Sequence, residues 1–153
     1  MKYSLCIILP EQEDIKEFRE AYGQVTPPHI TILYRTEINA IDHINEVLKE
    51  FKPFTVTLHG NGRSEQEHFL YLLLTNPQPL LDLHKAIHTG PLENERNVRM
   101  PKYIPHLTLG EFESAKELED AKQNFSQTVT INELAYLTHD EDGSVIKNQS
   151  LFL

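Results

Sequence analysis

The chain has 153 residues, of which 39% are hydrophobic and 24% are charged, and this composition is typical of one folded domain rather than of a disordered segment. Lys and Arg number 14 against 23 Asp and Glu, so the formal net charge is −9. Because non-specific nucleic-acid binding depends on contacts of Lys and Arg with phosphate, this charge disfavours a protein that coats DNA or RNA. It leaves room for a pocket that holds one phosphate group.

The sequence also lacks the features of secreted and membrane proteins. The single cysteine, Cys6, excludes an intrachain disulfide, and the longest apolar runs are far shorter than the roughly 18–20 residues of a membrane-spanning helix. The N-terminus has neither the apolar core nor the cleavage site of a secretory signal. We therefore expect a cytoplasmic monomer with no DNA or membrane partner, and we interpret Cys6, which lies between Leu5 and Ile7, as a buried strand thiol.

The first part of the chain predicts five elements in the order strand, helix, strand, helix, strand. Residues 3–9 are mostly apolar and are followed by Pro10, which indicates a buried strand. Apolar residues at Ile15, Phe18 and Tyr22 recur every three or four positions, as in an amphipathic helix. The predicted strands are 3–9, 29–34 and 54–58, the predicted helices are 11–22 and 38–51, and Gly60-Asn61-Gly62 predicts a turn.

The second part repeats this order and adds a hairpin. Ser114 followed by Glu117 predicts a capped helix start, and residues 140–143 predict a hairpin turn. The predicted strands are 69–74, 106–112, 128–138 and 145–153, and the predicted helices run from Pro79 to just before Gly90 and from about 115 to about 125. The repeated order indicates one domain, residues 1–153, built from two pseudo-duplicated lobes at approximately 1–62 and 63–153.

One short segment repeats in residue identity as well as in order. The third element of each half begins with proline, histidine, an apolar residue, threonine and a second apolar residue, at residues 28–32 and again at residues 105–109. The histidines, His29 and His106, are 77 residues apart, and so are the threonines, Thr31 and Thr108. A repeat at the same point of two similar halves favours a shared function over chance.

The spacing of the repeat places its polar side chains together. Residues i and i+2 of a strand face the same side, about 6–7 Å apart. His29 and Thr31 therefore share one face of their strand, and His106 and Thr108 share one face of theirs. If a pseudo-twofold axis relates the halves, the two faces oppose each other across a groove that holds two imidazoles and two hydroxyls.

This set of side chains suits the cleavage of a phosphodiester. The reaction needs a base for the attacking oxygen and an acid for the leaving oxygen, and histidine can do either near neutral pH. The hydroxyls of Thr31 and Thr108 can bind the non-bridging oxygens, where charge accumulates. The chemistry needs no metal or cofactor, and it leaves open which histidine is the acid. The alternative interpretation is that both histidines are hydrogen-bonded polar residues at strand ends.

The paired segments His29-Ile30-Thr31-Ile32 and His106-Leu107-Thr108-Leu109 resemble the HxTx motifs of the 2H phosphoesterase superfamily. This group includes 2′–5′ RNA ligase-like proteins and 2′,3′-cyclic nucleotide phosphodiesterases. The resemblance extends over nearly the whole chain, and the segments 89–92 and 103–106 are similar to those of its small bacterial phosphoesterases. It implies a bilobal α+β fold, with antiparallel sheets that face a central cleft and helices outside.

The resemblance also implies a function and a role for each motif residue. It implies a phosphoesterase that hydrolyses a 2′,3′-cyclic or 2′–5′ phosphodiester of a nucleotide or short RNA end, with His29 as proton donor, His106 as proton acceptor, and Thr31 and Thr108 on the phosphate. The alternatives are a non-catalytic nucleotide- or RNA-binding module on the same fold and a 2′–5′ RNA ligase. Many relatives carry a basic residue soon after the second motif, where this chain has Gly110-Glu111, so positive charge near the phosphate must come from elsewhere.

Other candidate residues lie just before His106. Arg99 and Lys102, together with Arg96, form a basic stretch in a loop that has no counterpart in the first half, and we interpret Arg99 and Lys102 either as a substrate clamp or as solvated charges. Tyr103 either stacks on a base or packs against the protein. His84 and His88 have a spacing that can bind metal, but no third ligand is evident, so we expect a half-buried helix face and no metal.

Overall fold

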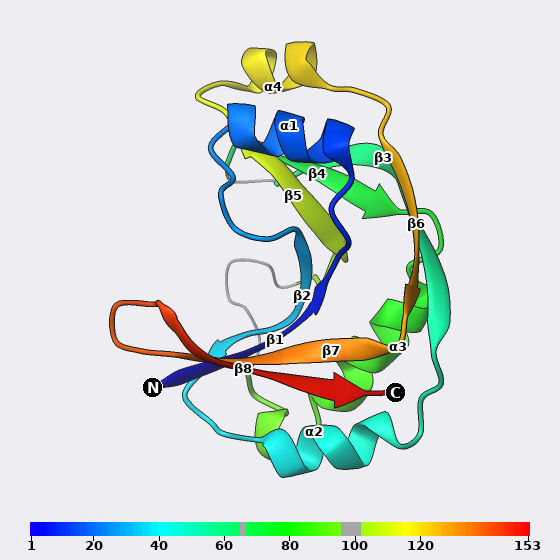
Figure 1. Ribbon diagram of the computed structural model, residues 1–153, viewed down its shortest axis with the longest axis vertical. Helices are drawn as coiled ribbons and strands as arrows, with labels where there is room; N and C mark the ends of the chain where they lie inside the picture. Colours follow the sequence, from blue (N-terminus) through cyan, green and yellow to red (C-terminus); the bar gives the residue numbers. More distant parts are fainter. Residues whose placement is uncertain (65–66, 96–101) are drawn as a thin grey trace.

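The computed structural model describes residues 1–64, 67–95 and 102–153, and its elements follow the predicted order (Figure 1). The strands are β1 (Lys2–Ile8), β2 (His29–Thr36), β3 (Phe54–Arg63), β4 (Phe69–Leu74), β5 (His106–Glu111), β6 (Ser126–Ile131), β7 (Glu133–His139) and β8 (Val145–Phe152). The helices are α1 (Glu13–Ala21), α2 (Ile41–Leu48), α3 (Gln78–Ile87) and α4 (Ala115–Ala121), with a 3₁₀ turn η1 (Gly90–Leu92).

The strands form two four-stranded antiparallel sheets, which confirms the expected α+β fold. The first sheet has the order β2-β1-β7-β8 and the second has the order β5-β4-β3-β6. Each sheet takes strands from both parts of the chain: β3 joins the second sheet, and β7 and β8 return to the first. The two sheets therefore do not coincide with the ranges 1–62 and 63–153 that are expected for the lobes.

Two helices also pack against the sheet to which the strands flanking them in the chain do not belong. The helix α1 precedes β2 in the chain but packs against β5 of the second sheet, whereas α3 precedes β5 but packs against β2 and α2. Figure 1 shows α1 and α4 beyond the second sheet at one end of the molecule and α2 and α3 at the opposite end. The buried side chains of both sheets belong to one apolar cluster, so the crossed connections join the two sheets into a single folded unit.

Local sequence signals explain the buried face of α1 and the start of α4. In α1, Ile15 and Phe18 are buried on the face toward the sheet, as their spacing predicts. The helix α4 begins at the predicted cap, where the backbone N–H of Glu117 donates to Ser114 Oγ at 3.2 Å. It ends at Ala121 rather than near residue 125. No helix among the described residues is long and apolar enough to cross a membrane.

Two expectations for the strands are wrong. The predicted single strand 128–138 is two strands, because Asn132 separates β6 in the second sheet from β7 in the first. The predicted turn at residues 60–62 lies inside β3, which continues to Arg63. Gly60 has φ +87°, which glycine adopts without steric cost, and the pairing of β3 with β4 shifts register there. Glycine therefore marks a bulge in a long strand instead of the end of a short one.

Candidate active site

The two His-x-Thr segments occupy the first residues of β2 and β5 with the predicted alternation. His29 and Thr31 on β2 are half-buried, whereas the intervening Ile30 is fully buried in the core. His106 and Thr108 on β5 are likewise half-buried. Each polar pair therefore occupies the face of its strand opposite to the core, as a period of two requires.

The fold brings the two motif strands together from different sheets. The strand β2 is the edge of the first sheet, β5 is the edge of the second, and the two edges contact each other. His29 and His106 are the first residues of these two strands, and the charge of His29 contributes to a lowered pKa of His106. The structure thus brings into contact two strands whose motifs lie 77 positions apart in the sequence.

Both imidazoles are held in the same way by the backbone. His29 Nδ1 lies 2.8 Å from the carbonyl oxygen of Pro27, and His106 Nδ1 lies 2.7 Å from that of Ile104. A carbonyl oxygen can only accept, so Nδ1 must carry the proton in both rings. This leaves Nε2 as the nitrogen that gains or loses a proton, and the bond two residues back fixes the orientation of each ring.

The surroundings of the two histidines differ. The ring of His106 stacks on Tyr71 of β4, with centroids 3.7 Å apart and an angle of 24° between the planes, whereas His29 has no ring contact in the part of the chain that the structure describes. Burial lowers the pKa of His106, the charge of His29 lowers it further, and the bond to Ile104 opposes both effects. His106 is therefore more readily deprotonated than an ordinary histidine.

Residues on the neighbouring strands lie beside the motif threonines. Cys6 lies opposite Thr31 in the register of β1 and β2, and Tyr71 lies opposite Thr108 in the register of β4 and β5. Cys6 is buried, as predicted, and burial raises its pKa to about 12, so it is a thiol and not a nucleophile. Tyr71 is the residue that the sequence analysis missed, because inside the apolar run 69–74 it carries no sign of a site until the strand pairing is known.

The backbone carbonyls of the two motif threonines each accept a hydrogen bond from a side chain of the other part of the chain. Arg19 Nε of α1 donates to the oxygen of Thr108 at 2.9 Å, and the Tyr103 hydroxyl donates to the oxygen of Thr31 at 2.8 Å. Arg19 is only 4% exposed and has no carboxylate partner within the described residues. Burial lowers its pKa.

The other predicted candidates have mixed outcomes. The ring of Tyr103 stacks on His84 at 3.8 Å with an angle of 8°, and burial raises the pKa of its phenol, so this tyrosine is packed against the protein. His84 also stacks on His88, and the described residues contain no group of three side chains suited to a metal ion. Lys102 is exposed, whereas Arg99 lies outside the residues that the structure describes.

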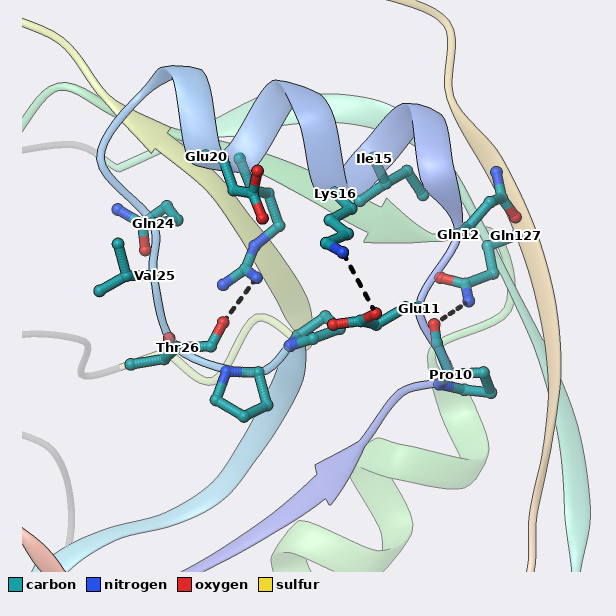
Figure 2. Close-up of a pocket in the computed structure, with 13 residues that line it drawn as sticks. Pro10, Glu11, Gln12, Ile15, Lys16, Glu20, Gln24, Val25, Thr26 and Gln127 are labelled. Atoms are coloured by element: carbon teal, nitrogen blue, oxygen red, sulfur yellow. Dashed lines mark hydrogen bonds and ion pairs between the residues drawn. The ribbon is translucent and has the colours of Figure 1, made fainter.

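A small pocket adjoins the segment that leads into His29. It has a volume of about 130 Å³ and is lined by α1, by residues 24–28 and by Gln127. Figure 2 shows it with Thr26 and its neighbours on one side and Gln12 and Gln127 on the other. None of the four motif residues lines this pocket, so it is separate from the site formed by the two motifs.

Three comparisons with known proteins agree with this architecture. A family model described as the 2′-5′ RNA ligase superfamily matches residues 9–143. A protein of Halalkalibacterium halodurans named "Putative phosphoesterase BH1439" is 24% identical over 132 residues, which cover 78% of this chain and 75% of that protein.

Solved structures share the fold over nearly the whole chain. The crystal structure of the Thermus thermophilus protein TT0787 matches with a TM-score of 0.64 and 18% identity, covering 99% of this chain and 98% of that one. Escherichia coli LigT complexed with 3′-AMP matches with a TM-score of 0.63 and 13% identity, covering 98% and 96%. At these identities the structural likeness shows the fold, and the family model covers most of the chain.

Proposed function

Because the chain belongs to the 2′-5′ RNA ligase superfamily, also known as the 2H phosphoesterases, we propose that it is a phosphoesterase that hydrolyses a 2′,3′-cyclic or 2′–5′ phosphodiester of a nucleotide or short RNA end. One observation carries the proposal: two histidines begin edge strands of different sheets that contact each other, each with Nδ1–H bound to a backbone carbonyl. Each ring then offers Nε2 for proton transfer. The complex of E. coli LigT with 3′-AMP supports a nucleotide as ligand.

The reaction requires one proton acceptor and one proton donor. The acceptor takes a proton from water as the water oxygen forms a bond to phosphorus. The bond from phosphorus to the leaving ribose oxygen breaks, and the donor protonates that oxygen. The two histidines exchange protonation states in this step, and a proton transfer through solvent restores them. Ligation would be a different step, in which a 5′-hydroxyl replaces water as the nucleophile on a 2′,3′-cyclic phosphate: the acceptor takes the proton of that hydroxyl, and the donor protonates the ribose oxygen that leaves phosphorus.

The surroundings of His106 favour it as the acceptor. Burial and the nearby charge of His29 lower the pKa of His106, so its Nε2 is unprotonated at neutral pH and available as a base. His29 is then the donor. Sequence alone left this choice open, and the resemblance to the 2H phosphoesterases implies the same assignment.

The threonine hydroxyls stabilise the phosphoryl oxygens. Thr31 and Thr108 share the faces of His29 and His106, so their hydroxyls can donate to the non-bridging oxygens, where negative charge increases in the transition state. The net charge of −9 disfavours long polyanions, which makes a nucleotide or short RNA end a better substrate than a folded RNA.

A panel of substrates tests the proposal. The purified protein is incubated with 2′,3′-cyclic nucleotides, 3′,5′-cyclic nucleotides and 2′–5′-linked dinucleotides, and the products are identified by chromatography. We expect hydrolysis of the first or third class, strongly reduced by His29→Ala and by His106→Ala. The matched control is His68→Ala, because His68 is exposed and belongs to neither motif. Hydrolysis that stays at the wild-type rate in both motif variants contradicts the proposal.

The same experiment distinguishes the alternatives. A binding module would take up the nucleotides, as measured by calorimetry, without turnover in any class. A ligase would join RNA ends bearing a 2′,3′-cyclic phosphate and a 5′-hydroxyl faster than it hydrolyses them. Either outcome replaces the hydrolase assignment while keeping the site.

A further inference from the structure

Arg19 and Tyr103 make equivalent contacts in the two parts of the chain. Arg19 precedes the first motif but bonds the carbonyl oxygen of Thr108 in the second. Tyr103 precedes the second motif but bonds the carbonyl oxygen of Thr31 in the first. Each side chain therefore connects one motif strand with the chain that leads into the other.

The contact of Arg19 extends to His29. Its Nη1 donates to the carbonyl oxygen of Thr26 at 2.8 Å, a contact marked at Thr26 in Figure 2. The next residue, Pro27, accepts the Nδ1–H bond of His29, and proline restricts the backbone there. The planar guanidinium holds its donors in a fixed relation, so it fixes the distance between β5 and the segment that orients His29.

A buried arginine that has no carboxylate partner among the described residues needs an explanation. Its desolvation costs free energy that two neutral carbonyl bonds repay only in part. An apolar side chain would occupy the same position without this desolvation cost. Arg19 is also a cation bonded to the backbone of the second motif, which is followed by Gly110-Glu111 and so has no basic residue directly after it.

Tyr103 makes the contact that corresponds to that of Arg19, with a neutral side chain. The ring is held by stacking on His84 of α3, and the helix α3 packs on β2. The hydroxyl therefore reaches Thr31 from a ring that is already fixed. Tyr103→Phe would remove this bond and leave the stacking in place.

We propose that Arg19 and Tyr103 are positioning residues that set the placement of His29 relative to His106 by bonding the threonine carbonyls of each other's motif strands. The inference rests on the proposed function, because relative placement matters when the two histidines act in one proton-transfer step. Neither side chain is assigned a contact with the substrate.

Steady-state kinetics of Arg19→Met and Tyr103→Phe tests this inference. We expect kcat to fall roughly 10- to 100-fold in each, since small misplacements of reacting groups are costly, with little change in KM. Arg19→Lys keeps the charge but cannot reproduce the two fixed donors, so it should recover only part of the loss. The double variant should lose less than the product of the single losses, because both bonds control one geometry.

Matched controls separate positioning from stability. Tyr136→Phe removes another internal phenol bond, from Tyr136 to Asn39 at 2.9 Å, and Arg63→Met removes an exposed arginine whose ion pair with Glu119 is 4.0 Å long. Both should leave kcat unchanged. The inference is wrong if Arg19→Met and Tyr103→Phe lower the melting temperature as Tyr136→Phe does and keep the wild-type kcat.

Nuclear magnetic resonance provides a readout that does not need activity. Long-range ¹H–¹⁵N spectra report the tautomer of each imidazole, and we expect the Nδ1–H form of His29 and His106 in the wild type. Arg19→Met should shift the ring signals of both histidines, whereas Arg63→Met should not. Unshifted rings in Arg19→Met and Tyr103→Phe overturn the inference even for an inactive protein, whereas inactivity of the wild type with shifted rings overturns only the proposed function.

Discussion

The two His-x-Thr motifs have the same local structure and different surroundings. In both, a histidine begins an edge strand and donates Nδ1–H to the carbonyl two residues earlier. Among the described residues, only His106 of the two stacks on an aromatic ring, that of Tyr71, and burial lowers its pKa. Under the proposed mechanism, one sequence motif used twice supplies both the acid and the base, because the side chains packed around the two copies differ.

The bonds to the two threonine carbonyls differ in the same way. Thr108 accepts from the buried cation Arg19, and Thr31 accepts from the neutral Tyr103. The geometry is reciprocal, but the positive charge lies on the side of His106 and Thr108. If this contrast matters for catalysis, substitutions in the two motifs and in their neighbours should have different effects.

The largest expected effect comes from the histidines themselves. His29→Ala and His106→Ala should each lower kcat by about 10²–10⁴, which is the usual contribution of one positioned acid or base. The double variant should lose less than the product of the single losses, because both act in one transfer. Rate measurements on a cyclic nucleotide check this, and wild-type kcat in either variant rules out the two-histidine mechanism.

The threonines should have a smaller effect. Thr31→Val and Thr108→Val keep the shape and remove a hydroxyl, and we expect kcat to fall roughly 10- to 100-fold, near the lower range for a lost oxyanion donor. Serine at either position should retain most of the activity. The control is Thr55→Val, whose hydroxyl bonds Thr130 on the exposed face of β3 and β6, and equal losses in Thr55→Val would point to a general packing effect.

The pH dependence should reflect the lowered pKa of His106. A base must be unprotonated, so kcat/KM falls on the acid side only as pH drops through the pKa of the base. Because burial lowers the pKa of His106, the acidic limb should lie below the ordinary histidine value of about 6.5. The two limbs belong to the coupled pair rather than to single residues. A rate that rises steadily to about pH 9 would instead implicate hydroxide as the nucleophile.

The same shift should be visible in stability. The unfolded chain binds a proton at His106 more readily than the folded chain, so this contribution to the free energy of unfolding is complete above about pH 6.5 and decreases as pH falls toward the lowered pKa. Urea titrations between about pH 7 and 5 should show a weaker pH dependence in His106→Gln than in the wild type. An identical dependence would show that the pKa of His106 is not lowered by folding.

Removal of the Tyr71 ring that stacks on His106 should make the surroundings of the two motif histidines more similar. Tyr71→Leu uncovers one face of the imidazole, so its pKa should rise toward the ordinary value and the acidic limb of kcat/KM should move to higher pH. We expect a smaller loss of kcat than for the threonine variants, because no reacting group is removed. Tyr71→Phe keeps the stacked ring and serves as the control, and an acidic limb that stays in place in Tyr71→Leu contradicts the role of burial.

The smallest expected effect is that of chelation. A site of two histidines and two hydroxyls performs acid–base chemistry without a metal, so excess EDTA should leave kcat within experimental error. Loss of activity that zinc or manganese restores would assign a metal to the reaction and remove the need for His106 as base.

Three features could be predicted from local sequence: the order of the elements, the repeat of His29-Ile30-Thr31 as His106-Leu107-Thr108, and the side of each strand that those residues occupy. These features are local, because helix and strand periodicities and turn residues act within a few positions. The predicted ends of α4 and β3 differ from those in the structure, since the ends of elements depend on what packs against them. The resemblance to a family then supplied the two-sheet architecture and the roles of the motif residues.

The membership of each strand in a sheet and the surroundings of each histidine depend on long-range packing. The division of residues 126–139 between two sheets at Asn132, the stacking of Tyr71 on His106 and the bonds from Arg19 and Tyr103 all join residues far apart in the chain. Such pairings depend on the register and burial of whole strands, and a short stretch of sequence does not specify them. The chain therefore encodes two equal motifs locally, and packing makes them unequal.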